Sequence, residues 1–403
     1  MKHRIVVLGA GYAGAITAGR LAKRLHRDDI EITLVNGDPE FVERIRMHQL
    51  ASGQDLPRRA LRDVYAGTGV RVRPARVTAV DADRRTVDLT DLTGCLTGED
   101  GAETLGYDTL VYALGSAAAD HGVPGVAEYA HNVAGKQAAL RLRERLGELR
   151  PGGTVLVAGG GLTAIESATE IAEAHPHLEV AVAARAGVGE WLSDKAQRHL
   201  REVFDRLGIT VHEHADITRV EADDVVTGTG ERIPAQVTVW TAGFTVHPIA
   251  AASTLEVSDT GRIVVDDTMR SVSHPDVYAV GDAAIAEGAG GGPLRMSCAS
   301  ATPMAWLAAD ALAARLTGRK VPETTIGYTF QCISLGRRDG IIQRVTPDDR
   351  ALPTAVQGRT AARIKELVCA GAVWGISHPT LMLPSRRHRV TATGEVESLV
   401  ATP

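Results

Sequence analysis

One pattern occurs twice in this 403-residue sequence and limits its fold more than any other feature. Residues 4–38 and 154–185 each contain an apolar run, a glycine-rich turn, a stretch of small residues and a second apolar run. This order is typical of a strand, a turn, a helix and a parallel strand, the unit of dinucleotide-binding domains. We therefore predict an α/β protein with two Rossmann-like dinucleotide-binding domains.

The first glycine turn reads GAGYAG and contains Gly9, Gly11 and Gly14. Between a strand and a helix, the first glycine allows a tight turn and the second lets the backbone approach a pyrophosphate. The third lets the helix pack close to the sheet. Asn36 ends the second apolar run, where an acidic residue usually binds ribose, and its amide oxygen can accept a bond from a ribose hydroxyl. These four residues are predicted cofactor contacts.

The second glycine turn reads GGGLTA and repeats the pattern with Gly159, Gly161 and Ala164. Its second apolar run ends in Ala184 and Arg185, so the usual acidic partner of the ribose 2′-hydroxyl is absent. An arginine at this place can contact a 2′-phosphate, and we therefore predict NADP in preference to NAD. The alternative is that Arg185 is an ordinary surface charge and that this site no longer binds a nucleotide.

Charge and cysteine content argue against several other classes of protein. The formal net charge of −5 makes nucleic acid an unsuitable partner. The four cysteines form no C-x-x-C pair, which argues against a zinc ribbon, a dithiol redox centre and a disulfide framework, and we predict no metal site. The sequence enters a strand at once and lacks an apolar run near the roughly 18 residues of a membrane span, so we expect a cytoplasmic protein.

Five segments carry a family resemblance: GAGYAG (9–14), LVYALGS (110–116), GGGLTAIESATEIA (159–172), TVWTAGF (238–244) and DVYAVGDAA (276–284). With them the chain resembles the flavoproteins with two dinucleotide-binding domains, in particular the branch of type II NADH dehydrogenases and apoptosis-inducing factors. The resemblance extends over nearly the whole chain. It implies FAD in the first domain and a nicotinamide dinucleotide in the second, with the nicotinamide ring laid against the flavin.

The resemblance also implies roles for particular residues. Asp282, directly after Gly281, is expected to contact the ribityl or pyrophosphate part of FAD. Gly115 and Gly243 match the family's crossover segments between the domains. Glu166 matches a position near the nicotinamide and the flavin, and is a candidate catalytic residue.

Ala301 and Thr302 match a helix start whose amides face the flavin pyrimidine. The positive end of a helix dipole there favours the negative charge of reduced flavin. From the same resemblance we expect an FAD domain in two parts, 1–118 and 244–320. An NAD(P) domain at 119–243 interrupts it, and a C-terminal α+β interface region at 321–403 follows.

Residues 41–53, FVERIRMHQLASG, depart from the family's pattern. Arg44, Arg46, His48 and Gln49 occur where quinone reductases of the family tend to be apolar, which predicts a polar wall for a hydrogen-bonding substrate. His48 is a candidate proton donor to a substrate or reduced flavin, because histidine titrates near neutral pH. Alternatively it is bonded within its loop or to the flavin phosphates. Paired cysteines, which sulfide-oxidising relatives need near the flavin, are not evident.

Residues 358–376 predict a helix in which Arg359, Arg363 and Lys365 stand beside an apolar end. This composition is compatible with peripheral contact to the inner face of a membrane. The alternative is that the helix packs on the FAD domain or across a homodimer interface. We also expect an exposed hairpin tip at 89–103 and a loose tail in the last dozen residues.

The sequence therefore predicts an FAD-dependent oxidoreductase that takes a hydride from NAD(P)H, with NADPH favoured, and passes electrons to a small-molecule acceptor that the sequence does not identify. One alternative is a membrane-associated type II NADH:quinone oxidoreductase. A second is a flavin-dependent oxidase or monooxygenase of a polar small molecule. A third is a flavin-binding protein without redox activity, whose nicotinamide site is empty.

Overall fold

The computed structural model describes residues 1–91, 102–382 and 386–391. Most of the predicted hairpin tip, Cys95 and the whole predicted tail lie outside these residues.

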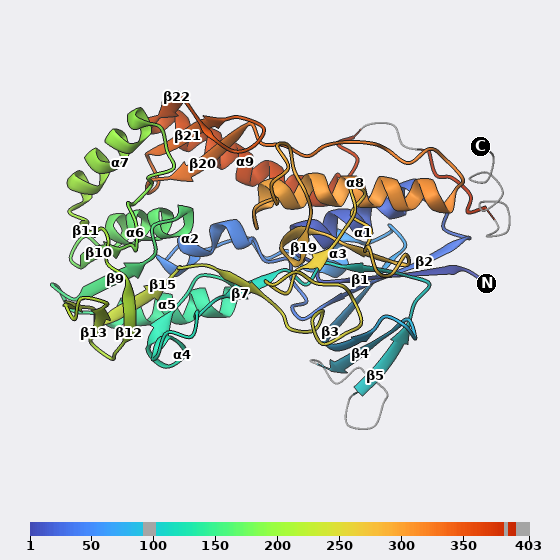
Figure 1. Ribbon diagram of the computed structural model, residues 1–403, viewed down its shortest axis with the longest axis horizontal. Coiled ribbons are helices and arrows are strands. Elements are labelled where there is room, and N and C mark those ends of the chain that lie inside the picture. Colours follow the sequence, from blue (N-terminus) through green and yellow to red (C-terminus); the bar gives the residue numbers. More distant parts are fainter. Residues whose placement is uncertain (92–101, 383–385, 392–403) are drawn as a thin grey trace.

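The first glycine unit forms the centre of a seven-stranded sheet (Figure 1). Its strand order is β18 (Val277–Ala279), β6 (Thr109–Tyr112), β1 (His3–Leu8), β2 (Ile30–Asn36), β3 (Val70–Asp81), β4 (Thr86–Asp91), β5 (Ala102–Gly106). The strands from β18 to β3 are parallel, and β4 and β5 extend the edge as antiparallel strands. Strand β18 follows the second glycine unit in sequence, so the chain leaves this sheet and later returns to complete it.

Helix α1 (Tyr12–Arg24) connects β1 to β2 and packs along α8 (Cys298–Leu316) and against α9 (Gly358–Ser377), as Figure 1 shows. The face of α1 towards the core is rich in alanine and glycine, which lets the helices approach closely. Arg20 and Arg24 both pair with Asp310 of α8, at 2.6 and 3.0 Å. These contacts join the second half of α1 to the second half of α8.

The second glycine unit forms a separate sheet of five parallel strands. Its order is β11 (Thr210–His212), β10 (Glu179–Ala183), β9 (Thr154–Ala158), β15 (Val237–Trp240), β8 (Ala130–His131). Its helices are α5 (Lys136–Glu148), α6 (Leu162–Ala174) and α7 (Asp194–Leu207). Each of the two sheets thus carries its own buried apolar core. The predicted α/β architecture with two dinucleotide-binding units is confirmed.

A short antiparallel ribbon joins the two sheets, formed by β7 (Ser116–Ala118) and β16 (Phe244–Val246). Gly115 and Gly243 precede these strands with φ angles of +70° and +143°, which residues with side chains rarely adopt. A Cβ atom on Gly243 would lie 2.8 Å from Nε2 of His121. The two glycines therefore allow the chain to cross between the sheets, and the division into domains at 118 and 243 stays our interpretation.

The C-terminal region consists of β20 (Phe330–Ser334), β21 (Gly340–Val345), β22 (Ala351–Gln357) and α9, and packs against α6 and α7. Asp339 binds α7 through Nε2 of His199 at 2.7 Å and through Arg206 at 2.8 Å. Trp191 donates to Gln331 at 2.8 Å. Because α9 also packs against α1, the C-terminal region contacts both nucleotide-binding units.

The remaining short elements connect these parts of the fold. They are η1 (Arg44–Arg46), α2 (Met47–Ala51), α3 (Leu61–Val64), α4 (Val126–Tyr129), β12 (Ile217–Val220), β13 (Asp224–Thr227), β14 (Arg232–Pro234), β17 (Ile263–Val264), η3 (Gly281–Ala283), β19 (Ala284–Ile285). None of the helices in the described ranges is long and apolar enough to cross a membrane.

Candidate active site

One cavity of about 1380 Å³ lies between the two sheets and reaches both glycine turns. Its wall also includes the crossover glycines, the start of α8 and one side of α9. The predicted site residues that line it are Gly11, His48, Gly115, Gly159, Gly161, Glu166, Arg185, Gly243, Gly281, Asp282, Ala301 and Thr302. Four predicted residues do not line it: Gly9, Gly14, Asn36 and Ala164.

The first glycine turn has the geometry that a pyrophosphate needs. A Cβ atom on Gly9 would lie 2.3 Å from the carbonyl oxygen of Ala113, and one on Gly14 would lie 1.9 Å from that of Gly9. These two glycines therefore serve close backbone packing. Gly11 begins α1, faces the cavity, and leaves open space within 4 Å of an added Cβ atom. No side chain caps the helix, so the first-turn amides are available to an anion.

Asn36 ends β2 beside the first glycine turn. Its Oδ1 accepts from the backbone N–H of Ala10 at 2.8 Å, and its Nδ2 donates to the carbonyl of Asp38 at 2.7 Å. The side chain thus braces the first glycine turn and does not line the cavity. The ribose contact stays a prediction, because Oδ1 can accept one more hydrogen bond and Nδ2 can donate one more.

Asp282 lies in the cavity wall directly after Gly281, whose φ of +72° makes the turn. Ser116 donates to Oδ2 of Asp282 at 2.6 Å. Arg44 donates to the Ser116 carbonyl and hydroxyl at 2.8 and 2.9 Å and lies 3.7 Å from the same carboxylate. A carboxylate, an arginine and two helix N-termini, those of α1 and α8, therefore face the first half of the cavity. This set of groups fits the phosphates and polyol of FAD.

The second glycine turn repeats this design. Gly159 has a φ of +134°, and Gly161 begins α6 without a capping side chain and with open space around an added Cβ atom. Ala164 is fully buried and serves packing. Ala184 is buried, and a Cβ atom on Gly160 would lie 3.0 Å from its Cβ.

Arg185 lines the cavity mouth, is exposed, and has no ion pair or hydrogen bond within the described part of the chain. Its guanidinium is thus available to a ligand in the second half of the cavity.

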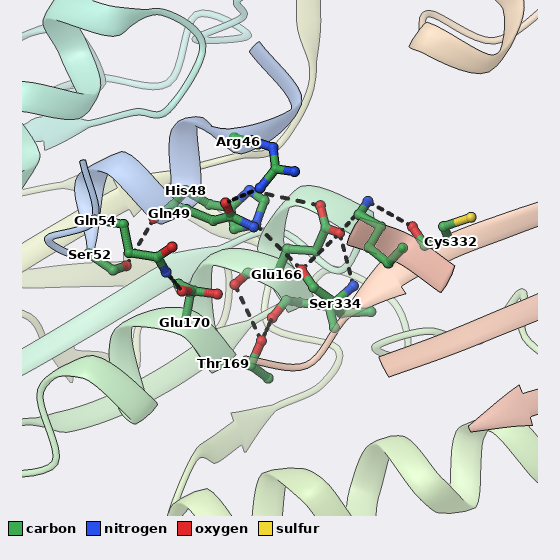
Figure 2. A network of polar contacts seen from close by, with 12 residues as sticks. Arg46, His48, Gln49, Ser52, Gln54, Glu166, Thr169, Glu170, Cys332 and Ser334 are labelled. Atoms are coloured by element: carbon green, nitrogen blue, oxygen red, sulfur yellow. Dashed lines mark hydrogen bonds and ion pairs between the residues drawn. The ribbon is translucent and has the colours of Figure 1, made fainter. Parts of the chain in front are cut away.

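A buried polar cluster lies where the two halves of the cavity meet (Figure 2). Glu166 of α6 forms an ion pair with Lys365 of α9 at 2.8 Å, and both side chains line the cavity. The N–H and hydroxyl of Ser334 donate to the same Oε1 atom of Glu166, at 3.0 and 3.1 Å. Nε2 of His48 lies 3.4 Å from the Ser334 hydroxyl, and its Nδ1 lies 4.0 Å from Glu166.

The surroundings set the charges of this cluster. Burial lowers the pKa of His48 to about 4, against the opposing effect of Glu166, so the imidazole is neutral at pH 7. Burial alone would raise the pKa of Glu166, but Lys365 and His48 hold it below the ordinary value. Burial would also lower the pKa of Lys365, but Glu166 raises it well above the ordinary value. The cavity therefore contains an ammonium–carboxylate pair next to a neutral histidine.

Sequence reasoning missed two members of this cluster, Lys365 and Ser334. It grouped Lys365 with the surface arginines of the C-terminal helix, which is wrong, because only 8% of Lys365 is exposed. The available signal was its spacing: Lys365 lies four residues from both Ala361 and Cys369, which are buried on the same face of α9. The polar wall predicted at 41–53 is also only partly formed, since of the four residues named for it Arg44 and His48 line the cavity and Arg46 and Gln49 do not.

The tertiary structure brings three cysteines to the cavity wall: Cys298, Cys332 and Cys369. All three are free thiols. Burial raises the pKa of Cys332 to about 12 and that of Cys369 to about 11, so these thiols are protonated at neutral pH. No group of three or more histidine, cysteine and acidic residues within the described residues could hold a metal ion.

Comparison with known proteins agrees with this geometry. The family model described as pyridine nucleotide-disulphide oxidoreductase matches residues 3–311. The chain belongs to this family. An NADH dehydrogenase-like protein of Mycobacterium tuberculosis is 30% identical over 327 residues, which cover 75% of this chain and 78% of that protein. The demethylphylloquinone reductase of Synechocystis is 26% identical over 361 residues, which cover 85% and 86%.

Solved structures of other proteins show the same fold. The structure of NDH2 from Plasmodium falciparum with NADH has a TM-score of 0.77 and 14% identity, covering 95% of this chain and 97% of that one. An engineered water-forming NADPH oxidase bound to NADPH has a TM-score of 0.70 and 18% identity, covering 85% and 75%. The substitutions of that oxidase include an aspartate changed to alanine and the next residue, an alanine, changed to arginine.

The predicted family resemblance is thus confirmed, and the protein is an FAD-dependent oxidoreductase that uses NAD(P)H.

Proposed function

We propose that this family member oxidises NADPH in preference to NADH and reduces a quinone. The observation that carries the proposal is the Glu166–Lys365 ion pair, buried in the wall of a cavity that is apolar on the side of α9. FAD, when bound in this cavity, supplies the redox chemistry by accepting a hydride and giving up two electrons.

The NADPH preference rests on the end of β10. A carboxylate that would bind the ribose 2′-hydroxyl and repel a 2′-phosphate is absent at Ala184. The unpaired Arg185 guanidinium at the cavity mouth suits a phosphate. The engineered NADPH oxidase carries the same Ala-Arg pair among its substitutions, which supports this assignment.

The quinone assignment rests on the wall formed by α9. Val368, Ala372 and Leu381 line the cavity beside Lys365. An apolar surface suits a quinone ring, and the ammonium can donate a hydrogen bond to a quinone oxygen as negative charge develops there. The polar alternative is weaker than the sequence predicted, because Arg44 already binds Ser116 and lies near Asp282.

The protein's own residues perform four tasks in this proposal. The glycine-started helices α1 and α6 bind the two pyrophosphates through their free amides. Lys365 holds a proton at Nζ, and Glu166 keeps that group charged although it is buried. Both members of this pair are buried from water, which strengthens these charge interactions.

The outer face of α9 suggests how a quinone reaches the cavity. Leu367 and Trp374 lie on its exposed side, with Leu381 and Met382 beyond its end, and 72% of Leu367 and 74% of Met382 are exposed. Arg359 and Arg363 precede this apolar stripe, and both are exposed. An apolar stripe with basic residues at one end suits the surface of an anionic bilayer. We infer that this stripe contacts the membrane surface and that a quinone enters the cavity from the α9 side.

The nucleotide preference is tested by anaerobic reduction of the bound flavin with NADPH and with NADH, followed through the visible absorbance of the oxidised flavin. We expect Arg185→Ala to weaken NADPH binding about 10- to 100-fold and to leave NADH nearly unchanged, because a charged hydrogen bond is lost.

Arg198→Ala is the matched control, since Arg198 is exposed on α7 and does not line the cavity. Equal effects of Arg185→Ala on both nucleotides would refute the 2′-phosphate contact. Failure of both nucleotides to reduce the wild-type flavin would refute the proposed donor.

A further inference from the structure

Helix α6 carries a row of three carboxylates that begins in the cavity. Glu166, Glu170 and Glu173 lie at positions i, i+4 and i+7, so consecutive members are one helical turn apart on the same face, with roughly 5–6 Å between their Cβ atoms. Glu166 lines the cavity, Glu170 is buried, and Glu173 is partly exposed. The row therefore leads from the cavity towards solvent.

Glu170 is the unusual member of this row. Only 1% of it is exposed, its Oε1 accepts from Gln54, and its Oε2 has no hydrogen-bond partner in the described structure (Figure 2). Among the residues that the structure describes, the only cation that pairs with it is Arg337, whose Nε lies 3.9 Å from Oε1. A buried carboxylate oxygen without a donor is costly, so the neutral acid is favoured.

The charged groups around Glu170 agree with this conclusion. Burial and the nearby carboxylates of Glu173, Glu166 and Glu366 raise its pKa, Arg337 opposes them, and together they bring it to about 7. Glu170 can therefore both release and accept a proton near neutral pH.

One segment of the C-terminal region runs along the whole row. Ser334 binds Glu166, the side chain of Arg337 lies beside Glu170, and the backbone N–H of Arg337 donates to Oε2 of Glu173 at 3.0 Å. Between them Gly336 has a φ of +75°, and a Cβ atom there would lie 1.9 Å from Oε2 of Glu173. Glycine thus lets this segment lie directly against the carboxylates. The segment shields the inner two, Glu166 and Glu170, from solvent.

The proposed reaction needs a proton from solvent. Overall, NAD(P)H, a quinone and one proton become NAD(P)⁺ and a quinol. NAD(P)H gives up a hydride, which is two electrons and one proton. The quinone gains two electrons and two protons. The hydride accounts for one of these protons, and the second has to reach the Glu166–Lys365 pair, which is buried.

We propose that Glu170 and Glu173 relay this second proton from solvent to the Glu166–Lys365 pair, and hence that the acceptor takes up protons together with its electrons. This inference rests on the proposed quinone reduction. Glu173 exchanges protons with solvent, Glu170 passes them inward, and Glu166 returns a proton to Nζ of Lys365 after that group has donated one to the acceptor. One bridging water per gap would join carboxylates one turn apart.

The test compares two acceptors on the purified holoenzyme, reduced anaerobically by NADPH and then mixed with either a short-chain quinone or ferricyanide. Ferricyanide takes one electron and no proton. We expect Glu170→Gln to slow flavin reoxidation by quinone roughly tenfold or more, together with the uptake of protons measured by a pH indicator. The rates with ferricyanide and of flavin reduction by NADPH should stay at the wild-type level.

Three further variants make the comparison specific. Glu170→Asp, which retains a carboxyl group, should restore part of the quinone rate. Glu173→Gln, nearer the surface, should slow it without risk to the core. Glu179→Gln is the matched control, because Glu179 is exposed on β10 of the same sheet and lies outside the row.

An infrared titration gives a readout independent of turnover. In the wild type, the band of a neutral carboxyl group should disappear as the pH rises through about 7. In Glu170→Gln this band should be missing at every pH. A wild-type quinone rate and pH profile in Glu170→Gln would overturn the relay, and so would equal losses with quinone and ferricyanide. A wild-type protein that ferricyanide reoxidises and quinone does not would instead refute the quinone function itself.

Discussion

At the scale of single residues, the Glu166–Lys365 pair shows how a charge is kept inside this protein. Both side chains are less than 10% exposed, and each would be strongly disfavoured in its charged form without the other. Removing two ions from water costs several kcal/mol each, and their attraction repays this only when further hydrogen bonds complete the site. Ser334 and the carbonyl of Cys332 provide those bonds, at 3.0–3.1 Å and 3.0 Å.

We therefore expect Glu166→Gln and Lys365→Met each to lower the free energy of unfolding by about 3–5 kcal/mol, because each leaves one unpaired buried charge. The double variant should lose clearly less than the sum of the two single variants. Urea unfolding of the three variants measures this coupling, and additive losses would contradict the ion pair.

Glu170 and His48 should make the free energy of unfolding depend on pH in opposite directions. Glu170 has a pKa of about 7 in the fold against 4.5 as its ordinary value, so the folded state holds more protons in this window. The free energy of unfolding then falls by about 3 kcal/mol as the pH rises from 4.5 to 7. His48, lowered from 6.5 to about 4, contributes the reverse: stability is present above pH 6.5 and is lost as the pH falls towards 4.

Glu170→Gln should remove the first effect and leave the second. We expect the unfolding free energy of this variant to rise steadily from pH 4.5 to 6.5, where the two effects nearly cancel in the wild type. Thermal unfolding across this range measures the difference, and parallel curves for the two proteins would disprove the raised pKa of Glu170.

At the scale of elements, the two glycine-started helices separate packing from ligand binding. In α1, Gly14 faces the backbone of Gly9, whereas Gly11 faces the cavity. The same glycine motif therefore contains one position that the fold requires and one that the ligand requires. The second turn repeats this division, with buried Ala164 in the packing position and Gly161 facing the cavity.

We expect Gly14→Ala to destabilise the protein even without flavin, by about 1–3 kcal/mol or more, since its Cβ atom would lie 1.9 Å from the Gly9 carbonyl oxygen. Gly11→Ala should change the stability of the flavin-free protein by less than about 0.5 kcal/mol and yet reduce retention of FAD. The flavin content of the purified proteins and their flavin-free melting temperatures distinguish the two. Full FAD retention in Gly11→Ala would refute the pyrophosphate contact.

At the scale of the whole molecule, α9 links the cavity to the surface. One face of this helix carries Lys365 and Val368 into the cavity wall, and the opposite face exposes Leu367 and Trp374. The nucleotide is expected at the side of the second sheet, whereas the acceptor would enter from the side of α9. The two substrates can thus reach one cavity from different directions.

We expect Leu367→Ser combined with Trp374→Ser to reduce co-sedimentation with vesicles that contain anionic lipid, because the apolar stripe is lost. Electron transfer from NADPH to ferricyanide should not change, since neither residue lines the cavity. Unchanged vesicle binding would rule out the membrane contact. A loss of dimers in analytical sedimentation instead would assign the stripe to a homodimer interface.

The sequence by itself determined the two nucleotide-binding units and the strand end at Ala184 and Arg185, whereas the crossover glycines were implied by the family resemblance. These features could be predicted because a tight turn and a helix start depend on residues that are neighbours in the chain. Only the tertiary structure decided that Glu166 pairs with Lys365 of α9, that His48 is neutral, that Asn36 braces a turn and that three distant cysteines share one wall. Partners and pKa values of this kind depend on burial and on contacts between remote elements, which a local sequence pattern does not report.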